Sequence, residues 1–250
     1  MYLDLNIKGN NYDSDLILAK EANHWGWNHI SFNYKNNNYY NASAYLDQIK
    51  KNFTNKDFTN KNFTNKDFTI DLRCEISNNN CNQIQKNIRN FRPKTKCLSV
   101  LGGDSKVNRV ACENIKIDIL SRPYFKRKDC GINHVLAKEA SENNVAIELC
   151  FKDILNSYLS YRAKLLMYFR DIINLYRKFE FPLILSSGAS SIYDIRNPID
   201  LTYFFKDIGL KDDEVLNSIS NTPLNILKFN ENRDNLILKG VKKIEGFNET

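Results

Sequence analysis

Short apolar runs alternate with amphipathic segments along most of the chain. Several runs are continuous stretches of β-branched and aliphatic residues, which is typical of parallel strands buried on both faces. The runs predict strands over residues 2–7, 27–33, 69–76, 97–101, 115–120, 145–149 and 182–186. Between them, apolar positions spaced three and four apart predict helices over residues 14–24, 42–51, 81–91, 104–114 and 131–143.

This alternation of strands and helices, without a long series of consecutive strands, predicts an α/β fold. We expect a single TIM-barrel-like domain over residues 1–230, with about seven parallel strands inside a ring of helices. A doubly wound open sheet is the alternative. Residues 231–250 are polar and weakly patterned and are expected to form a loosely ordered tail.

The clearest helical signal covers residues 152–179. Its apolar residues follow one another at spacings of three and four, which places them in one stripe on a helix or on two consecutive helices. We expect the stripe to pack against the sheet, with its aromatic residues in the core. It consists of Ile154, Tyr158, Tyr161, Leu165, Phe169, Ile172, Tyr176 and Phe179. Shorter helices are predicted over residues 199–208 and 212–219.

A five-residue repeat separates the second predicted helix from the third predicted strand. Residues 53–69 read FTNKDFTNKNFTNKDFT. A period of five matches neither a helix nor a strand, and a surface loop lengthens at small entropic cost. We therefore expect residues 53–68 to be a low-complexity insertion in a surface loop, flexible and without function.

Composition narrows the cellular setting of the 250-residue chain. Its mean hydropathy is −0.51, and no apolar stretch approaches the roughly 20 residues of a membrane-spanning helix. The first residues lack a basic region before an apolar run, so they do not resemble a signal peptide. The six cysteines form neither a Cys-x-x-Cys motif nor a zinc-ligand spacing. We expect a cytoplasmic protein with reduced thiols and no membrane partner.

Positive charge is concentrated in one part of the sequence. The formal net charge is +7, whereas residues 84–128 alone carry 12 basic and 3 acidic residues. A concentration of this kind favours a polyanionic partner, either a nucleic acid or an acidic protein. The alternative is that the fold scatters these lysines and arginines over the surface.

Two junctions between a predicted strand and the following helix favour anion binding. The first is the basic segment SRPYFKRK at residues 121–128, followed by a helix start near His134, with Lys138 on the same helix face. The second is the small-residue segment SSGASS at residues 186–191, followed by Asp194 and Arg196. A small-residue turn that leads into a helix suits a phosphate or a carboxylate.

No catalytic set is apparent in the sequence. The three histidines are not spaced as metal-ligand pairs. Carboxylates within predicted strands would need histidine partners to hold a catalytic metal, and those partners are missing; these carboxylates are Asp4, Asp71, Asp118 and Glu148. We expect no catalytic residue and no metal in this chain, which we interpret as a binding protein on an enzyme-like fold.

Several motifs occur together in an order and spacing that resemble one protein family. They are DILSRP at residues 118–123, GINHVLAKEA at 131–140, AIEL at 146–149, SSGA at 186–189 and DIRNP at 194–198. This combination resembles the archaeal ribonuclease P protein component 3 family, related to the thirty-kilodalton eukaryotic subunit. The resemblance covers roughly residues 1–210, and the repeat and the tail depart from the family pattern.

The resemblance implies a TIM-like barrel related to metal-dependent phosphatases but without their metal ligands. It also implies a subunit of the ribonucleoprotein that removes the 5′ leader from precursor tRNA. In that complex the RNA is the catalyst and needs magnesium, whereas this chain needs no cofactor. The implied partners are ribonuclease P RNA, protein component 2 and other ribonuclease P protein subunits, with precursor tRNA as the substrate of the complex.

The resemblance also implies RNA-binding residues. Arg122, Lys138 and Arg196 lie in the matching motifs, and Arg109 and Lys211 are looser matches. Our hypothesis is that Arg122, Lys138, Arg196 and Lys126 line one rim and contact backbone phosphates without reading bases. Two alternatives remain open, namely a free-standing metal-dependent phosphoesterase on the same barrel and a protein-only interaction module.

Overall fold

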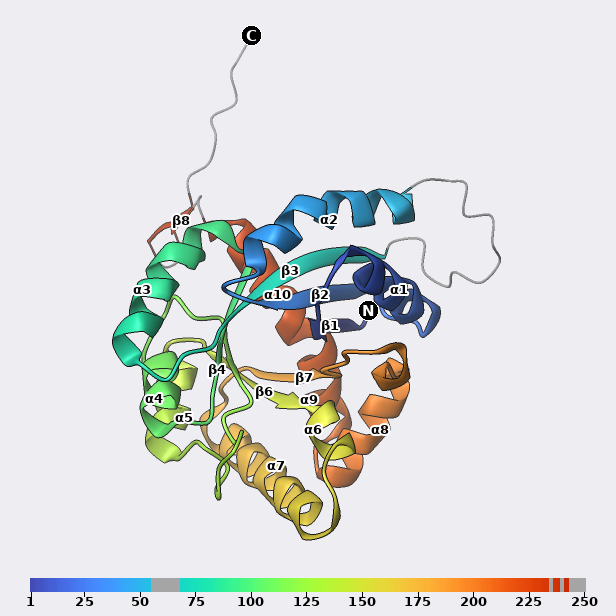
Figure 1. Cartoon of the computed structure of the whole chain (residues 1–250). Helices are drawn as coiled ribbons and strands as arrows, with labels where there is room; N and C mark the ends of the chain where they lie inside the picture. The colour runs from blue at the N-terminus through green and yellow to red at the C-terminus, as the bar shows by residue number, and fades with distance from the viewer. Residues whose placement is uncertain (55–67, 234–235, 239–240, 243–250) are drawn as a thin grey trace.

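The computed structural model describes residues 1–54, 68–233, 236–238 and 241–242. Seven parallel strands form one sheet in which each strand pairs with the next one in the sequence (Figure 1). The strands are β1 (Leu3–Lys8), β2 (His29–Lys35), β3 (Thr69–Ile76), β4 (Cys97–Leu101), β5 (Ile119–Ser121), β6 (Ala146–Cys150) and β7 (Leu183–Ser186). The predicted number and order of strands are confirmed.

The sheet curls into a nearly closed barrel. The first and last strands lie next to each other, and the Lys8 backbone N–H donates to the Ala189 carbonyl oxygen at 2.7 Å. A doubly wound sheet would reverse its strand order near the middle, whereas here the order follows the sequence throughout. The TIM-barrel-like prediction is therefore confirmed.

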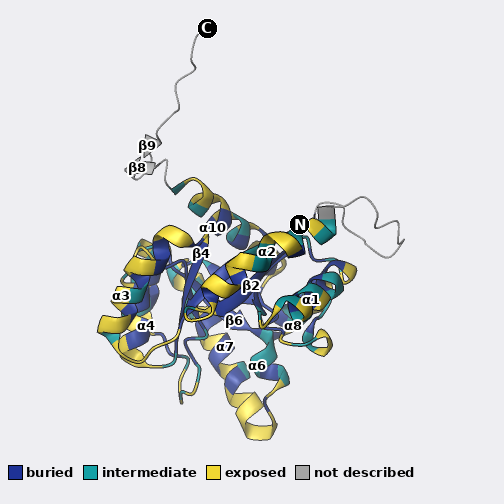
Figure 2. Ribbon diagram, turned by 45° about the horizontal axis from the view of Figure 1, so that its top comes forward, coloured by how far each residue is buried: buried dark blue, intermediate teal, exposed yellow. Residues whose placement is uncertain are grey.

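Helices cover the outside of the barrel and bury their apolar faces against the strands (Figure 2). In chain order they are α1 (Tyr12–His24), α2 (Tyr39–Thr54), α3 (Cys81–Phe91), α4 (Ser105–Cys112), α5 (His134–Glu142), α6 (Phe151–Leu155), α7 (Leu159–Phe179) and α8 (Pro198–Ile208). Short 3-10 turns lie at η1 (Arg92–Lys94) and η2 (Ile192–Asp194). No helix in the part of the chain that the structure describes is both long and apolar enough to cross a membrane.

The last helical stretch closes the amino-terminal end of the barrel. It consists of α9 (Asp212–Leu216), the π-helical turn η3 (Asn217–Asn221) and α10 (Thr222–Glu231). Ile226 and Leu227 of α10 pack against inward-facing residues such as Leu3 and Ile184. The apolar side chains of α10 therefore fill the amino-terminal end of the barrel and exclude water from the barrel interior.

The fifth strand is shorter than the sequence predicts. Residues 115–118 precede β5, and Ile115 is 68% exposed. Asn114 organises a turn there, because its side chain accepts from the Lys116 N–H and its carbonyl accepts from the Ile117 N–H. This local turn outweighs the β-propensity of the two isoleucines.

The apolar stripe over residues 152–179 divides between two helices, α6 and α7. Leu165, Phe169 and Ile172 are buried, as predicted. Tyr158 and Tyr161 are 73% and 46% exposed, so placing all the aromatic residues of the stripe in the core was wrong. The reason is that α7 begins at Leu159, so Tyr158 precedes the helix, and Tyr161 lies in its first turn, which is exposed.

The two ends of the five-residue repeat lie close together. Residues 55–67 are outside the described residues, but Phe53 at the end of α2 and Phe68 before β3 are included. Their ring centroids are 5.2 Å apart, and Phe68 is buried. The segment thus leaves and rejoins the barrel at one place, and its assignment as an insertion without function stays a prediction.

The predicted tail is described only in part. After residue 233 the structure describes β8 (Leu236–Leu238) and β9 (Val241–Lys242), which pair antiparallel. The remaining residues of the tail lie outside the described ones. The loosely ordered tail, and the domain boundary before it, stay predictions.

Candidate nucleic-acid interface

The middle of the barrel interior holds a buried ion pair. Arg73 of β3 donates to both carboxylate oxygens of Glu148 of β6, at 2.8 and 2.7 Å, and both side chains are fully buried. The Nε of Arg73 also donates to Ser99 Oγ at 2.8 Å. Burial alone would raise the pKa of Glu148, but the charge and hydrogen bonds of Arg73 lower it to about 2. Hydrogen bonds and an ion pair therefore connect β3 to β4 and β6 through the barrel interior, which is not filled only with aliphatic side chains.

Two of the other three carboxylates named in the sequence analysis, Asp118 and Asp71, also have cationic partners. Asp118 Oδ2 lies 2.6 Å from Arg92 Nη1, and Asp71 Oδ1 lies 3.2 Å from Lys50 Nζ. Among the residues that the structure describes, no three His, Cys, Asp or Glu side chains are grouped so that they could hold a metal ion.

Asp4 in β1 is fully buried and has no cationic partner in an ion pair among the described residues. Burial raises its pKa to about 6, against hydrogen bonds from Ser187 and from the Asn6 N–H that lower it. The folded state therefore favours the neutral acid. The stability that protonation provides is complete below about pH 4, the ordinary pKa, and is lost as the pH rises through about 6.

We expect Asp4→Asn to remove this pH dependence. Between pH 4 and pH 7 the wild-type chain should lose up to about 3 kcal/mol more unfolding free energy than the variant, since each pKa unit is worth about 1.4 kcal/mol. Urea unfolding of both proteins at the two pH values measures the difference. Parallel pH profiles would show that Asp4 titrates normally in the folded chain.

The loop over residues 121–131 lies at the carboxyl end of β5, and one buried amide holds it in place. Asn108 of α4 donates from Nδ2 to the carbonyl oxygens of Pro123 and Gly131, at 3.0 and 2.8 Å. Its Oδ1 accepts from the Gly103 N–H at 2.9 Å. One side chain thereby fixes the loops that follow β4 and β5 against each other.

Two glycines make this close packing sterically feasible. Gly131 has a φ of +80°, and a Cβ there would lie 2.0 Å from the Pro123 carbonyl oxygen. Gly103 has a φ of +124°, and a Cβ there would lie 2.4 Å from the Phe125 carbonyl oxygen. Both contacts are with backbone atoms of the loop over residues 121–131, called the basic loop below. A side chain at either glycine would therefore displace the basic loop.

Arg122 is a brace for this loop rather than a free cation. Its Nε donates to Asp153 Oδ2 at 2.7 Å, its Nη2 pairs with Oδ1, and the side chain is 17% exposed. Burial disfavours its charge, but Asp153 more than compensates and raises the pKa of Arg122. Its φ of +53° is unusual for a residue with a side chain. The Tyr124 hydroxyl donates to the same carboxylate at 2.9 Å.

The tip of the loop presents an aromatic ring between cations. The Arg122 guanidinium lies 4.3 Å from the Phe125 ring centroid, and Lys126 Nζ lies 5.3 Å from it. Lys126 and Lys128 are exposed, and neither forms an ion pair within the described part of the chain. The neighbouring Arg127 is held by Asp129 and the Gly103 carbonyl. The loop therefore offers two unpaired ammonium groups on a rigid backbone.

The second predicted anion site is filled by the chain itself. Asp194 Oδ2 accepts from the backbone N–H groups of Ser190 and Ser191, each at 3.0 Å, and from Lys152 Nζ at 2.8 Å. Burial alone would raise its pKa, but these donors lower it to about 2. The small-residue turn after β7 thus suits a carboxylate, as expected, and that carboxylate is internal.

The remaining predicted contacts are spread over three parts of the molecule. Arg109 and Lys138 lie on the adjacent outer helices α4 and α5, are 65% and 67% exposed, and each pairs with a glutamate four residues on. Arg196 follows η2, and its Nη1 donates to the carbonyls of Tyr193 and Ile195. Their contacts with RNA stay predictions.

Lys211 lies at the opposite end of the barrel from the basic loop. It precedes α9 and lines a cavity together with Pro182 and Leu183, which lead into β7 at its amino end. The structure thus brings Arg122 and Lys126 together, leaves Arg109 and Lys138 on the neighbouring flank, and separates Lys211 from all of them.

Sequence reasoning missed Asn108 and Lys152, which shape the carboxyl-terminal end of the barrel, and Arg73 in its interior. An arginine at an inward position of a strand was a detectable signal, because an isolated charge inside a barrel needs a partner. Asn108 gave no local signal, since its three bonds reach loops that come together only in the folded chain.

Comparison with known proteins places this geometry in one family. The sequence model described as "RNase P subunit p30" matches residues 1–235. The chain belongs to this family. The resemblance that the motifs indicated is therefore confirmed, and the match extends past residue 210.

Curated relatives agree with this assignment. Ribonuclease P protein component 3 of Methanothermobacter thermautotrophicus is 47% identical over 159 residues, which cover 64% of this chain and 65% of the relative. The protein of the same name from Methanosarcina mazei is 37% identical over 172 residues, covering 69% of this chain and 72% of the relative.

Solved structures show the same architecture. A chain in the cryo-EM structure of archaeal ribonuclease P with mature tRNA is 31% identical, with a TM-score of 0.75 over 99% of this chain and 100% of that chain. The crystal structure of an uncharacterized protein, 8% identical, has a TM-score of 0.62 over 99% of this chain and 76% of the other. This second likeness concerns the fold alone.

Proposed function

We propose that this chain is a protein subunit of the ribonuclease P ribonucleoprotein, which generates mature tRNA 5′ ends by cleaving the leader from precursor tRNA. The observation that carries this proposal is the family match over residues 1–235. The full-length similarity to a chain of archaeal ribonuclease P supports it. In this proposal the RNA cleaves the bond, and the chain supports the RNA.

The basic loop at the carboxyl end of β5 is the RNA contact in this proposal. Lys126 and Lys128 are exposed and unpaired by any described acid, so they can meet phosphates without first breaking an internal ion pair. Each such contact releases counterions from the RNA, which makes binding depend steeply on salt. The phosphate backbone of the RNA is the same for every base sequence, so this contact positions the RNA without reading its bases.

The other proposed contacts extend from this loop. Arg109 and Lys138 on the flanking helices, and Arg196 beyond β7, would reach phosphates that pass the same end of the barrel. Arg122 contributes by holding the loop through Asp153. Lys211 would require RNA at the opposite end, so among the proposed contacts it is the one that the geometry supports least.

The proposed partners are ribonuclease P RNA, protein component 2, other ribonuclease P protein subunits, and precursor tRNA as the substrate of the complex. We propose that magnesium is held by the RNA and that this chain takes no cofactor. We also propose a cytoplasmic location, which the similarity to archaeal relatives favours because archaeal cells have no nucleus.

Reconstitution with one component left out tests the proposed function. Ribonuclease P RNA is assembled with the other protein subunits, with and without this chain, and precursor tRNA cleavage is followed at limiting magnesium. We expect leader removal to slow markedly without the chain, and we expect none from the chain alone. Leader removal by the isolated chain, or no change when it is omitted, would refute the proposal. Phosphatase turnover with a stoichiometric metal would favour the free-standing phosphoesterase instead.

A further inference from the structure

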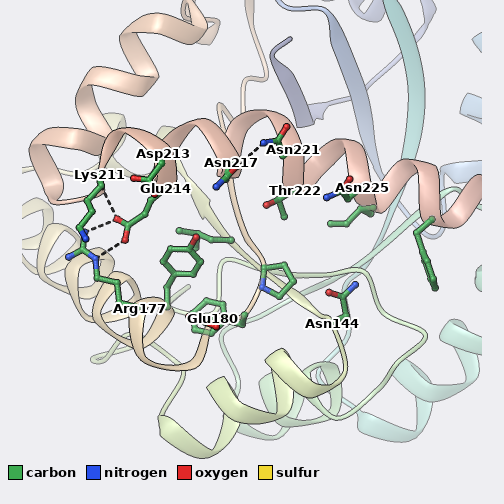
Figure 3. A pocket seen from close by; sticks show the side chains of 16 residues that line it. Asn144, Arg177, Glu180, Lys211, Asp213, Glu214, Asn217, Asn221, Thr222 and Asn225 are labelled. Atoms are coloured by element: carbon green, nitrogen blue, oxygen red, sulfur yellow. Dashed lines mark hydrogen bonds and ion pairs between the residues drawn. The ribbon is translucent and has the colours of Figure 1, made fainter. Parts of the chain in front are cut away.

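A groove of about 870 Å³ lies at the amino-terminal end of the barrel, opposite the basic loop. One wall is the continuous helical stretch of α9, η3 and α10 (Figure 3). The other wall is formed by Asn144, just before β6, and by residues 180–183, which lead into β7. The groove therefore runs along the side of a helix, over the start of two strands.

Uncharged polar side chains line the middle of this groove. Asn217, Thr222 and Asn225 lie along the groove side of the helix, and Asn144 lies across from them (Figure 3). In the π-helical turn Asn217–Asn221, the Thr222 backbone N–H donates to the Asn217 carbonyl oxygen five residues back, which brings the first two close together. Within the described residues, the side chains of Asn144, Thr222 and Asn225 have no hydrogen-bond partner.

A hydrogen bond from Asn221 fixes the orientation of the Asn217 side chain. The Asn221 side-chain nitrogen donates to Asn217 Oδ1 at 2.7 Å, which fixes the Asn217 amide and leaves its two N–H donors for another molecule. An asparagine side chain offers a donor and an acceptor, the same pair that a peptide unit offers. The lining therefore matches main-chain amides better than it matches phosphates.

The charges at one end of the groove argue against a polyanion. Glu180 and Asp213 are exposed there and form no ion pair with any described residue. Arg177 is neutralised by Glu214, with Nη2 and Oε2 2.7 Å apart, which leaves Lys211 as the unpaired cation. This end is net negative, so it disfavours RNA and favours a neutral or basic chain.

The other end of the groove is apolar. Phe229 of α10 is 49% exposed and lies beside the buried Ile226, and the Arg233 guanidinium lies 5.3 Å from its ring centroid. A ring exposed at the end of a polar groove can cover an apolar side chain of a bound segment. The groove thus offers, in order, a negative end, a row of amides and an apolar end.

We propose that this groove binds an extended peptide segment of a partner protein. Asn217 and Asn225 are eight residues apart, about 12 Å along a helix, which is close to the length of four residues of extended chain. Each amide then pairs with the main chain of the segment, whose apolar side chain rests on Phe229 and whose basic side chain faces Asp213. This inference rests on the proposed function, because the partner is another protein subunit of the complex, and it assigns a role to the end of the barrel that faces away from the basic loop.

Photo-cross-linking from Phe229 tests the occupant. The full chain carrying p-benzoylphenylalanine in place of Phe229 is assembled with ribonuclease P RNA and the other protein subunits, irradiated and mapped by mass spectrometry. The control carries the same group in place of Tyr203, an exposed ring on α8. We expect residue 229, and not residue 203, to cross-link to one short segment of a protein subunit. Cross-links to RNA, to this chain or to nothing would overturn the inference.

A change of charge at constant side-chain shape measures the contribution of the amides. Asn217→Asp with Asn225→Asp keeps the side-chain shape but replaces N–H donors by oxygens that repel peptide carbonyls. We expect affinity for the cross-linked subunit, measured by surface plasmon resonance without RNA, to fall about tenfold or more. The control, Asn79→Asp with Asn90→Asp, adds the same charge at exposed positions and should change affinity little. Equal effects of the two pairs would overturn the inference, whereas the reconstitution result would stand by itself.

Discussion

Replacing Arg73 with Met is expected to lower the free energy of unfolding by about 3–5 kcal/mol. The substitution leaves the Glu148 carboxylate in the barrel interior without its two charged hydrogen bonds, at a site with no exposure to water. The pKa of Glu148 should then rise above its present value of about 2, because burial still raises it and Arg73, the largest influence that lowers it, is gone. Urea unfolding at pH 7, followed by circular dichroism, measures the loss.

Two further variants separate the buried pair from a general effect of losing a charge. Lys138→Met breaks an ion pair with Glu142 that is more than half exposed, and it should cost less than about 1 kcal/mol. Combining Arg73→Met with Glu148→Leu should recover most of the stability, since no uncompensated charge remains. A loss for Arg73→Met as small as that for Lys138→Met would contradict a dry barrel interior.

Reversing the charge of Lys126 and Lys128 together is expected to weaken binding to ribonuclease P RNA about tenfold to a hundredfold at low salt. Both ammonium groups are exposed on the braced loop after β5, and neither is neutralised by a described acid. Glutamate at these positions removes two phosphate contacts and adds repulsion. Arg122 is less suitable for this test, because its loss would also release Asp153 and loosen the loop.

The salt dependence of binding gives the sharper readout. Loss of two phosphate contacts should lower the slope of log affinity against log salt by roughly 1.5–2, whereas a misfolded loop would change affinity without that defined change. The control reverses Lys178 and Lys228, two exposed lysines near the amino-terminal end of the barrel. Filter binding from 50 to 300 mM salt compares the variants. An equal loss of affinity in the control would place the RNA elsewhere.

Much of the architecture followed from local patterns. The strands β3 and β4 begin and end where the apolar runs predict, and the motifs at residues 118–123 and 131–140 are enough to indicate the family. Local errors arose where a short-range signal competed with the pattern. Asn114 organises a turn where the sequence predicts a strand. Tyr158 lies just before the exposed first turn of α7 and is not buried, although the apolar spacing places it in the stripe.

The candidate site was predicted less completely. The basic segment at residues 121–128 was recognised, but the sequence could not distinguish Arg122, which pairs with Asp153, from Lys126, which stays unpaired. The turn after β7 was recognised as an anion site, but not that Asp194 occupies it. In both places the deciding partner is a carboxylate brought in by the fold.

The amino-acid sequence by itself determined about seven strands, the α/β class and the family, because hydrophobic periodicity and motif spacing are properties of residues near one another in the sequence. Tertiary structure alone decided which charges remain available. Arg73 and Glu148 are 75 positions apart in the sequence and come into contact only in the folded barrel. Lys211 follows α8 and therefore lies at the end of the barrel opposite Lys126. Ion pairing depends on the distance between charges in space, and exposure depends on what packs around a side chain, so neither can be read from sequence spacing.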